Sequence, residues 1–232
     1  MTDDNRELVI VLHGLGRTHL SMWRIAHTLR HAGYRVINRS YPSRTMPIGE
    51  VATSWLPRLL NRYQAAAAPK IHFVTHSMGG IVVRLWLRDM HPGRLSDNYG
   101  RIVMIAPPNH GSEIPDRMCK NPFFRFFTGI NGRQLGTNPD SLPNQLLGSP
   151  IPAQIDLGVI AGNFSLNPLF SSWIGRPNDG KVSVISTRLP GMRHHIVMPY
   201  SHTWLTLRAP VMEQVKTFLS TGRFLESNQP SK

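Results

Sequence analysis

The strongest constraint on the fold is a strand pattern that runs directly into a glycine-rich turn and then into a helix. Ile71–Val74 predicts a strand, and the run THSMGG follows it at 75–80. Residues 79–90 are apolar almost all round apart from two arginines, which predicts a mostly buried helix. The two glycines supply the small residues that are needed where strand and helix nearly touch. Such a turn projects Ser77 over the edge of the sheet.

Strands alternate with helices along most of the chain. Strand patterns cover Leu8–Leu12, 34–37, 101–106, 157–161, 182–185 and 195–198, and helical patterns cover 19–32, 48–63 and 210–219. Pro57 is expected to kink or interrupt the second of these helices. The alternation predicts one α/β domain over 1–226, with a mostly parallel central sheet and helices on both faces. Active sites of such sheets lie at the carboxyl ends of the strands. A polar tail, expected to be disordered, follows at 227–232.

Residues 107–154 break this pattern and are expected to form a long, irregular, lid-like insertion. The stretch is rich in Pro, Gly, Asn and Phe and has no long periodic segment. Long irregular insertions in compact domains are usually functional or mobile. The phenylalanines Phe123, Phe124, Phe126 and Phe127 fit the apolar face of a lid, but equally a small satellite core under the loop. Cys119, the only cysteine, lies here and is assigned no role.

His202 is the strongest candidate for a general base. It follows a predicted strand and precedes the last helix, which places it at the carboxyl edge of the sheet. His194 and His195 open the preceding strand, so they are expected at its opposite end. A base must come within hydrogen-bond reach of its nucleophile.

Asp179 is the preferred acid because it lies in a turn, PNDG at 177–180, between two strand patterns. Asp156 begins a strand and therefore lies at the wrong edge of the sheet. Asp116 and Asp140 lie in the insertion and are weaker candidates. An acid in this position orients the base and stabilises its protonated form.

Five sequence pieces together resemble the α/β-hydrolase family, and in particular small bacterial lipase- and esterase-like members. They are HGLGR, THSMGG, APPNHGSE, NDGKVSV and SHTWL. The order of Ser77, Asp179 and His202 is that of a Ser-Asp-His catalytic triad in this fold. Thr75 departs from the family pattern G-x-S-x-G, whose first glycine it replaces. The resemblance implies a core of six or seven strands with Ser77 as the nucleophile.

The resemblance also implies an oxyanion hole and a pocket. His13 and Gly14 end the first strand as the HG pair of lipases does, so the main-chain N–H groups of Leu15 and Met78 are the expected donors, with Gly79 allowing the close approach. A plain glycine turn and a serine that only caps a helix are the alternatives. The residues expected to line the pocket are His76, Asn109, His110, Phe123 and Phe127.

The charge of the chain is strongly basic, with 26 Lys and Arg against 13 Asp and Glu. This balance favours an anionic membrane surface or an anionic substrate, although a generally basic soluble protein explains it as well. No nucleic-acid-binding motif is present. The N-terminus lacks the pattern of a signal peptide, and no apolar run is long enough to span a membrane, so cytoplasmic residence is expected.

Together these features predict hydrolysis of a carboxylic ester through an acyl-enzyme on Ser77. No metal cluster or dinucleotide-binding fingerprint is present, so no cofactor or metal is expected. Acyl transfer by the same three residues is one alternative. A binding protein that lacks catalysis is the other, because fold alone does not determine function.

Overall fold

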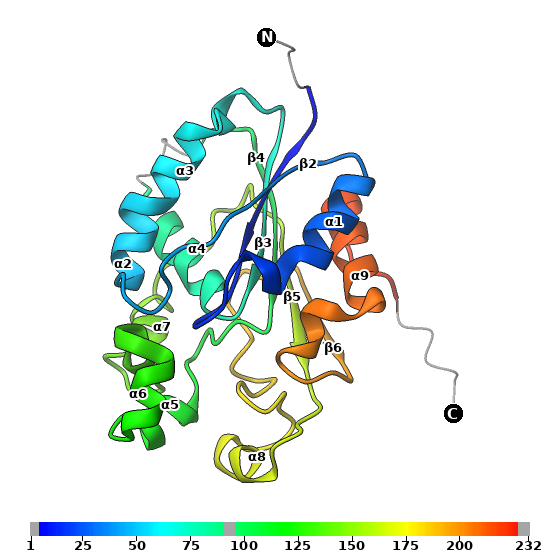
Figure 1. Ribbon diagram of the computed structural model, residues 1–232. Helices are drawn as coiled ribbons and strands as arrows, with labels where there is room; N and C mark the ends of the chain where they lie inside the picture. Colours follow the sequence, from blue (N-terminus) through cyan, green and yellow to red (C-terminus); the bar gives the residue numbers. More distant parts are fainter. Residues whose placement is uncertain (1–4, 91–95, 227–232) are drawn as a thin grey trace.

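The structure is a computed structural model that describes residues 5–90 and 96–226 (Figure 1). Within these residues the central sheet has six strands in the order β2-β1-β3-β4-β5-β6, and all neighbouring strands are parallel. They are β1 (Leu8–Leu12), β2 (Arg35–Asn38), β3 (Ile71–His76), β4 (Tyr99–Ile105), β5 (Leu157–Gly162) and β6 (His194–Met198). The predicted parallel α/β sheet is confirmed, whereas the tail at 227–232 lies outside the described residues.

Successive side chains of a strand point to opposite faces of the sheet, and they form two cores, one on each face. Leu8, Ile10 and Leu12 of β1 face one core, and Val9 and Val11 face the other. The first core is covered by α2 (Ile48–Glu50), α3 (Leu56–Arg62) and α4 (Met78–Asp89), and the second by α1 (Trp23–His31) and α9 (Ala209–Thr221), as Figure 1 shows. Within residues 5–90 and 96–226, no helix is both long and apolar enough to cross a membrane.

The helix predicted over 48–63 is interrupted, which is one of the two outcomes expected from Pro57. A π-helical turn, Val51–Trp55, separates α2 from α3, and Pro57 lies in the first turn of α3. Proline has no N–H to donate and is well tolerated in a first turn, so the wider π turn lets the chain continue in the same direction.

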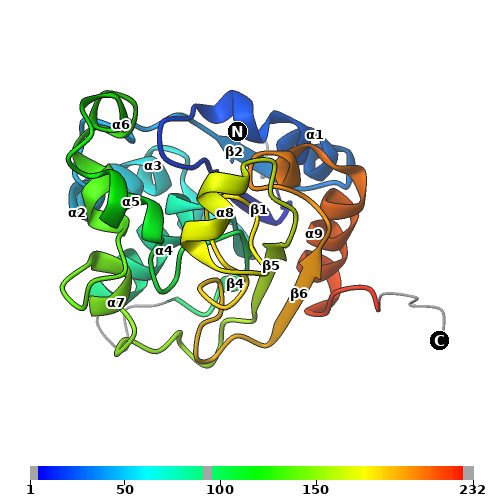
Figure 2. The ribbon, with the colours of Figure 1, turned by 90° about the horizontal axis from the view of Figure 1, so that it is seen from below.

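The insertion contains several short helices joined by irregular segments. It contains α5 (Glu113–Met118), α6 (Pro122–Thr128), a 3₁₀ segment over Gly129–Leu135 and α7 (Leu142–Gln145). The side chain of Asn121 accepts hydrogen bonds from the first N–H groups of α6, at 2.9 and 3.1 Å. Short helices with polar caps and early prolines are stable without a long apolar period. Figure 2, seen from below, shows these helices to the left of the strands and α8 (Pro168–Ile174) in front of the sheet.

The strand predicted at 182–185 does not form. Oδ1 of Asp179 accepts hydrogen bonds from the N–H groups of Lys181 and Val182, at 2.9 and 2.8 Å. This curls the chain around the carboxylate, and only an isolated bridge between Asn178 and Ser183 remains. An aspartate that binds the backbone two residues ahead favours a turn over an extended strand.

Candidate active site

Ser77 occupies the sharp turn between β3 and α4. Its backbone has φ 53° and ψ −123°, a conformation that a residue other than glycine rarely adopts. The turn is held by a hydrogen bond from the Ser77 N–H to the carbonyl of Ile105, at 2.9 Å. A Cβ atom at Gly79 would lie 2.8 Å from the carbonyl oxygen of Leu12, so only glycine fits where α4 meets the end of β1. The partly exposed Ser77 side chain therefore lies at the carboxyl edge of the sheet.

Thr75 fits beneath this turn although it stands where the family pattern has glycine. Its side chain is fully buried. A Cβ atom at Gly80 would lie 3.4 Å from Oγ1 of Thr75 and 3.1 Å from Cβ of Pro107. The missing side chain at position 80 thus leaves the room that the threonine fills.

The predicted acid and base are joined by a short hydrogen bond. Nδ1 of His202 lies 2.7 Å from Oδ2 of Asp179, and both side chains are buried. The other carboxylate oxygen accepts the N–H groups of Lys181 and Val182. A second link runs from the His202 N–H to the Asp179 carbonyl, at 3.0 Å. This arrangement holds the proton on Nδ1 of His202 and leaves Nε2 available as a base.

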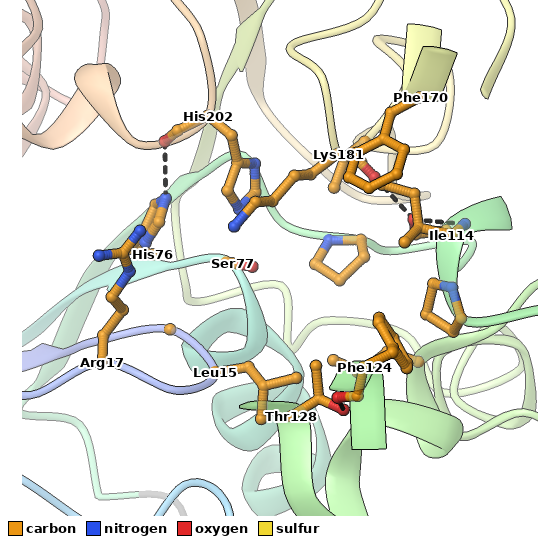
Figure 3. A pocket seen from close by; sticks show the side chains of 16 residues that line it. Leu15, Arg17, His76, Ser77, Ile114, Phe124, Thr128, Phe170, Lys181 and His202 are labelled. Atoms are coloured by element: carbon orange, nitrogen blue, oxygen red, sulfur yellow. Dashed lines mark hydrogen bonds between the residues drawn. The ribbon is translucent and has the colours of Figure 1, made fainter. Parts of the chain in front are cut away.

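Ser77 and His202 line the same pocket, of about 260 Å³ (Figure 3). In the described part of the chain, no hydrogen bond joins the Ser77 hydroxyl to the His202 ring. Such bonds are often long in unliganded sites and tighten in the reacting complex. The structure therefore brings the three predicted residues to one edge of the sheet, with Ser77 and His202 facing a shared cavity.

No family model and no curated protein matches the chain. Solved structures do resemble it. A lipase from Bacillus licheniformis has a TM-score of 0.70 at 17% identity, over 95% of this chain and 93% of that chain. A metagenomic carboxyl esterase has a TM-score of 0.61 at 17% identity, over 95% and 72%. A phospholipase from Legionella pneumophila has a TM-score of 0.62 at 19% identity, over 78% of this chain but 45% of that chain. The chain has the α/β-hydrolase fold.

In this α/β-hydrolase fold the loop after β1 lies against the turn that carries Ser77. A Cβ atom at Gly14 would lie 3.1 Å from Cβ of Ser77 and from Nδ1 of His76. The main-chain N–H groups of Leu15 and Met78 make no hydrogen bond with any described residue. Met78 begins α4, and the first N–H groups of a helix have no partner within it. Two unused donors thus flank Ser77 from different segments.

Two buried, neutral histidines make hydrogen bonds to the backbone around the site. Nε2 of His76 lies 3.0 Å from the carbonyl oxygen of His202, and the two rings are 4.7 Å apart. Burial, reinforced by the nearby His202, lowers the pKa of His76 well below its usual value. Nδ1 of His13 binds the carbonyl of Gly14 at 2.9 Å, while its Nε2 accepts the N–H of Tyr41 at 3.1 Å. Burial lowers the pKa of His13 to about 4. Both rings therefore act as neutral hydrogen-bonding groups at pH 7.

The pocket wall differs from the one expected. Asn109, His110, Phe123 and Phe127 do not line the pocket, whereas His76 does. Asn109 is buried and donates to the carbonyl of Thr187 at 2.8 Å, which makes it a structural residue. The pocket is lined by Gly14, Leu15, Arg17, His76, Ser77, Pro108, Ser112, Ile114, Pro115, Phe124, Thr128, Leu135, Phe170, Lys181, Val182 and His202.

Sequence reasoning missed Arg17, Lys181 and Phe170 among these lining residues. Lys181 is two positions after Asp179, so its place near the base follows once the turn around that carboxylate is known. Phe170 lies on α8, a helix without a strong sequence pattern. No group of three His, Cys, Asp or Glu side chains within 5–90 and 96–226 is arranged to hold a metal ion.

Proposed function

We propose that this chain is a hydrolase that cleaves a carboxylic ester through an acyl-enzyme on Ser77. The observation that carries the proposal is the 2.7 Å bond between Asp179 and His202 at a pocket that also contains the Ser77 side chain. Similarity to lipase and carboxyl esterase structures supports the same reaction class.

In the proposed reaction, Nε2 of His202 takes the Ser77 proton as the hydroxyl oxygen attacks the acyl carbon. Asp179 keeps the imidazole oriented and stabilises its protonated form. The N–H groups of Leu15 and Met78 stabilise the oxyanion, and one such donor contributes about 3–4 kcal/mol to the transition state. His202 then protonates the leaving alcohol, and water releases the acyl group by the reverse sequence of proton transfers.

The lining supports an acyl ester with an apolar chain. Ile114, Phe124, Leu135 and Phe170 form much of the wall. Large, exposed apolar side chains lie on α6, beside the pocket: Phe123, Phe126 and Phe127. Exposed apolar patches of this kind mark interaction surfaces, and the basic charge of the chain suits an anionic lipid surface. We propose that α6 is the part of a lid that contacts such a surface.

The reaction is tested with Ser77→Ala, Asp179→Asn and the control Ser220→Ala, assayed on a chain-length series of 4-nitrophenyl esters. Alanine keeps the Cβ atom, so the Ser77 turn needs no repacking. We expect kcat to fall about 10⁵-fold for Ser77→Ala and about 10³- to 10⁴-fold for Asp179→Asn, which presents the wrong hydrogen-bonding group to Nδ1. The exposed Ser220 should tolerate its change.

Fluorophosphonate labelling provides an independent readout of the nucleophile. Mass spectrometry should find the label on Ser77 in the wild type. It should find no label in the Ser77→Ala variant, whose circular dichroism spectrum should match that of the wild type. Ester hydrolysis that survives in folded Ser77→Ala would remove this mechanism. A folded wild type that neither reacts with the label nor cleaves any ester would favour a binding protein.

A further inference from the structure

Two cationic side chains line the otherwise largely apolar pocket, close to the base. Lys181 lies in the turn around Asp179, and Arg17 lies in the loop after β1. Nη2 of Arg17 donates to Oγ1 of Thr203 at 3.2 Å, one residue beyond His202. In Figure 3, Lys181 extends past the His202 ring toward Ser77, while Arg17 lies beside His76.

In the described part of the chain neither cation forms a salt bridge, although the charge of Asp179 acts on Lys181. Asp179 lies near Lys181, but its oxygens are used by His202 and by two main-chain N–H groups. Desolvation by the surrounding protein atoms, together with the charge of Arg17, lowers the pKa of Lys181, and the charge of Asp179 opposes this shift. Both side chains also reach solvent, so water solvates them in the free protein, and an anion bound in the pocket could contact both.

The chemistry of the site indicates which part of an ester these cations would meet. His202 must give its proton to the leaving oxygen, so the alcohol part lies on the His202 side of Ser77. Arg17 and Lys181 lie on that side in Figure 3, whereas Ile114 and Phe124 lie on the other. In this view Ser77 lies between Arg17 and the apolar side chains of Ile114 and Phe124, while the stem of Lys181 runs past Phe170.

We propose that the preferred substrate is an ester whose alcohol part carries a carboxylate or a phosphate close to the scissile bond, bound by Arg17 and Lys181. This inference rests on the proposed ester hydrolysis and adds the charge of the alcohol. It also distinguishes the pocket from the general surplus of basic residues, because these two cations line the cavity that contains Ser77 and His202.

The test uses three esters with the same acyl chain: 4-carbamoylphenyl butyrate, 4-carboxyphenyl butyrate and 4-(butyryloxy)phenyl phosphate. The first is a neutral analogue of the second, and the third compares phosphate with carboxylate. The wild type should show at least tenfold higher kcat/KM for one of the anionic esters than for the neutral one. Added salt should reduce this ratio, because partly exposed charge pairs are screened.

The variants Arg17→Met and Lys181→Met should each reduce the anionic-to-neutral ratio severalfold, mainly through KM, and the double variant should bring it near one. Arg24→Met removes an exposed arginine of α1 that does not line the pocket and serves as the control for net charge. A ratio near one in the wild type, or a ratio that Arg24→Met lowers as much as Lys181→Met does, would overturn the inference.

Binding to Ser77→Ala separates this inference from the proposed function. Calorimetry should show tighter binding of 4-carboxyphenyl butyrate than of 4-carbamoylphenyl butyrate to that variant, and the difference should vanish when Lys181→Met is added. If the wild type hydrolyses all three esters equally and this binding difference is absent, ester hydrolysis stands and the anion preference fails. If the difference is present but no ester is cleaved, the proposed function fails.

Discussion

The turn that carries Ser77 and the insertion at 107–154 border the same pocket but are built in opposite ways. The first ten residues of α4 are all buried, and Gly79 lies against the backbone of β1. In α6, no residue is buried, and Phe123 is 76% exposed. The comparison teaches that the wall formed by α4 is fixed by packing on every side, whereas the insertion is anchored by other buried residues, such as Leu146, and leaves α6 exposed beside the pocket.

The two regions are joined by a buried arginine of α4. The Arg84 guanidinium donates to the carbonyl and the side-chain oxygen of Asn109, at 2.9 and 3.2 Å, and to the carbonyl of Pro143, at 3.2 Å. Burial lowers the pKa of Arg84 to about 10, so it remains charged at pH 7. It thereby attaches the start and the later part of the insertion to the helix that follows the nucleophile.

The largest contrast should come from adding one methyl group to each region. Gly79→Ala places a Cβ atom 2.8 Å from the Leu12 carbonyl oxygen and 3.0 Å from that of His13, so the start of α4 must shift. We expect a loss of about 3 kcal/mol in the free energy of unfolding and a strong loss of activity. Gly148→Ala, in the insertion, meets no atom within 4 Å and should change stability little. Urea denaturation measures both, and equal losses would refute the contrast.

The sequence was most informative where packing is repetitive. Buried parallel strands give continuous apolar runs, so Leu8–Leu12 and Leu157–Gly162 were located to within one residue. Glycines around Ser77 indicated the turn because backbone contact there excludes a side chain. The meeting of Asp179 and His202 was predicted from the rule that strands of one sheet end at a common edge.

The remaining parts depend on contacts that no local pattern encodes. The segment at 182–185 has the composition of a strand, but the carboxylate of Asp179 captures its first N–H groups. Arg17 and Phe170 reach the pocket from segments more than 150 positions apart. Phe124 rather than Phe123 lines the pocket because the direction of α6 selects between adjacent side chains.

A smaller effect should appear when the pH is lowered, and it should originate at His13, the residue directly after β1. The folded state lowers the pKa of His13 to about 4, so the unfolded chain binds more protons and stability falls as pH falls from about 6.5 toward 4. Between pH 7 and pH 5 this group alone should remove about 2 kcal/mol from the free energy of unfolding. Urea denaturation at both pH values measures the loss.

The variant His13→Gln keeps an acceptor for the Tyr41 N–H and cannot be protonated, so its loss between the two pH values should be about 2 kcal/mol smaller than that of the wild type. His31→Gln, an exposed histidine of α1, is the matched control and should leave the difference unchanged. An equal dependence on pH in the wild type and in His13→Gln would show that the buried ring is not its source.

The smallest effect on stability is expected from the exposed phenylalanines of α6, and it decides between a lid surface and a satellite core. Phe123, Phe126 and Phe127 are 76%, 67% and 65% exposed, so changing all three to serine should alter the free energy of unfolding by no more than about 0.5 kcal/mol for each residue. If α6 contacts lipid, the same triple variant should bind phosphatidylglycerol vesicles several times more weakly in a flotation assay. Phosphatidylcholine vesicles test the contribution of charge. A loss of several kcal/mol with unchanged vesicle binding would instead show that these rings form a core, because buried aromatic residues stabilise the folded chain through the area they remove from water.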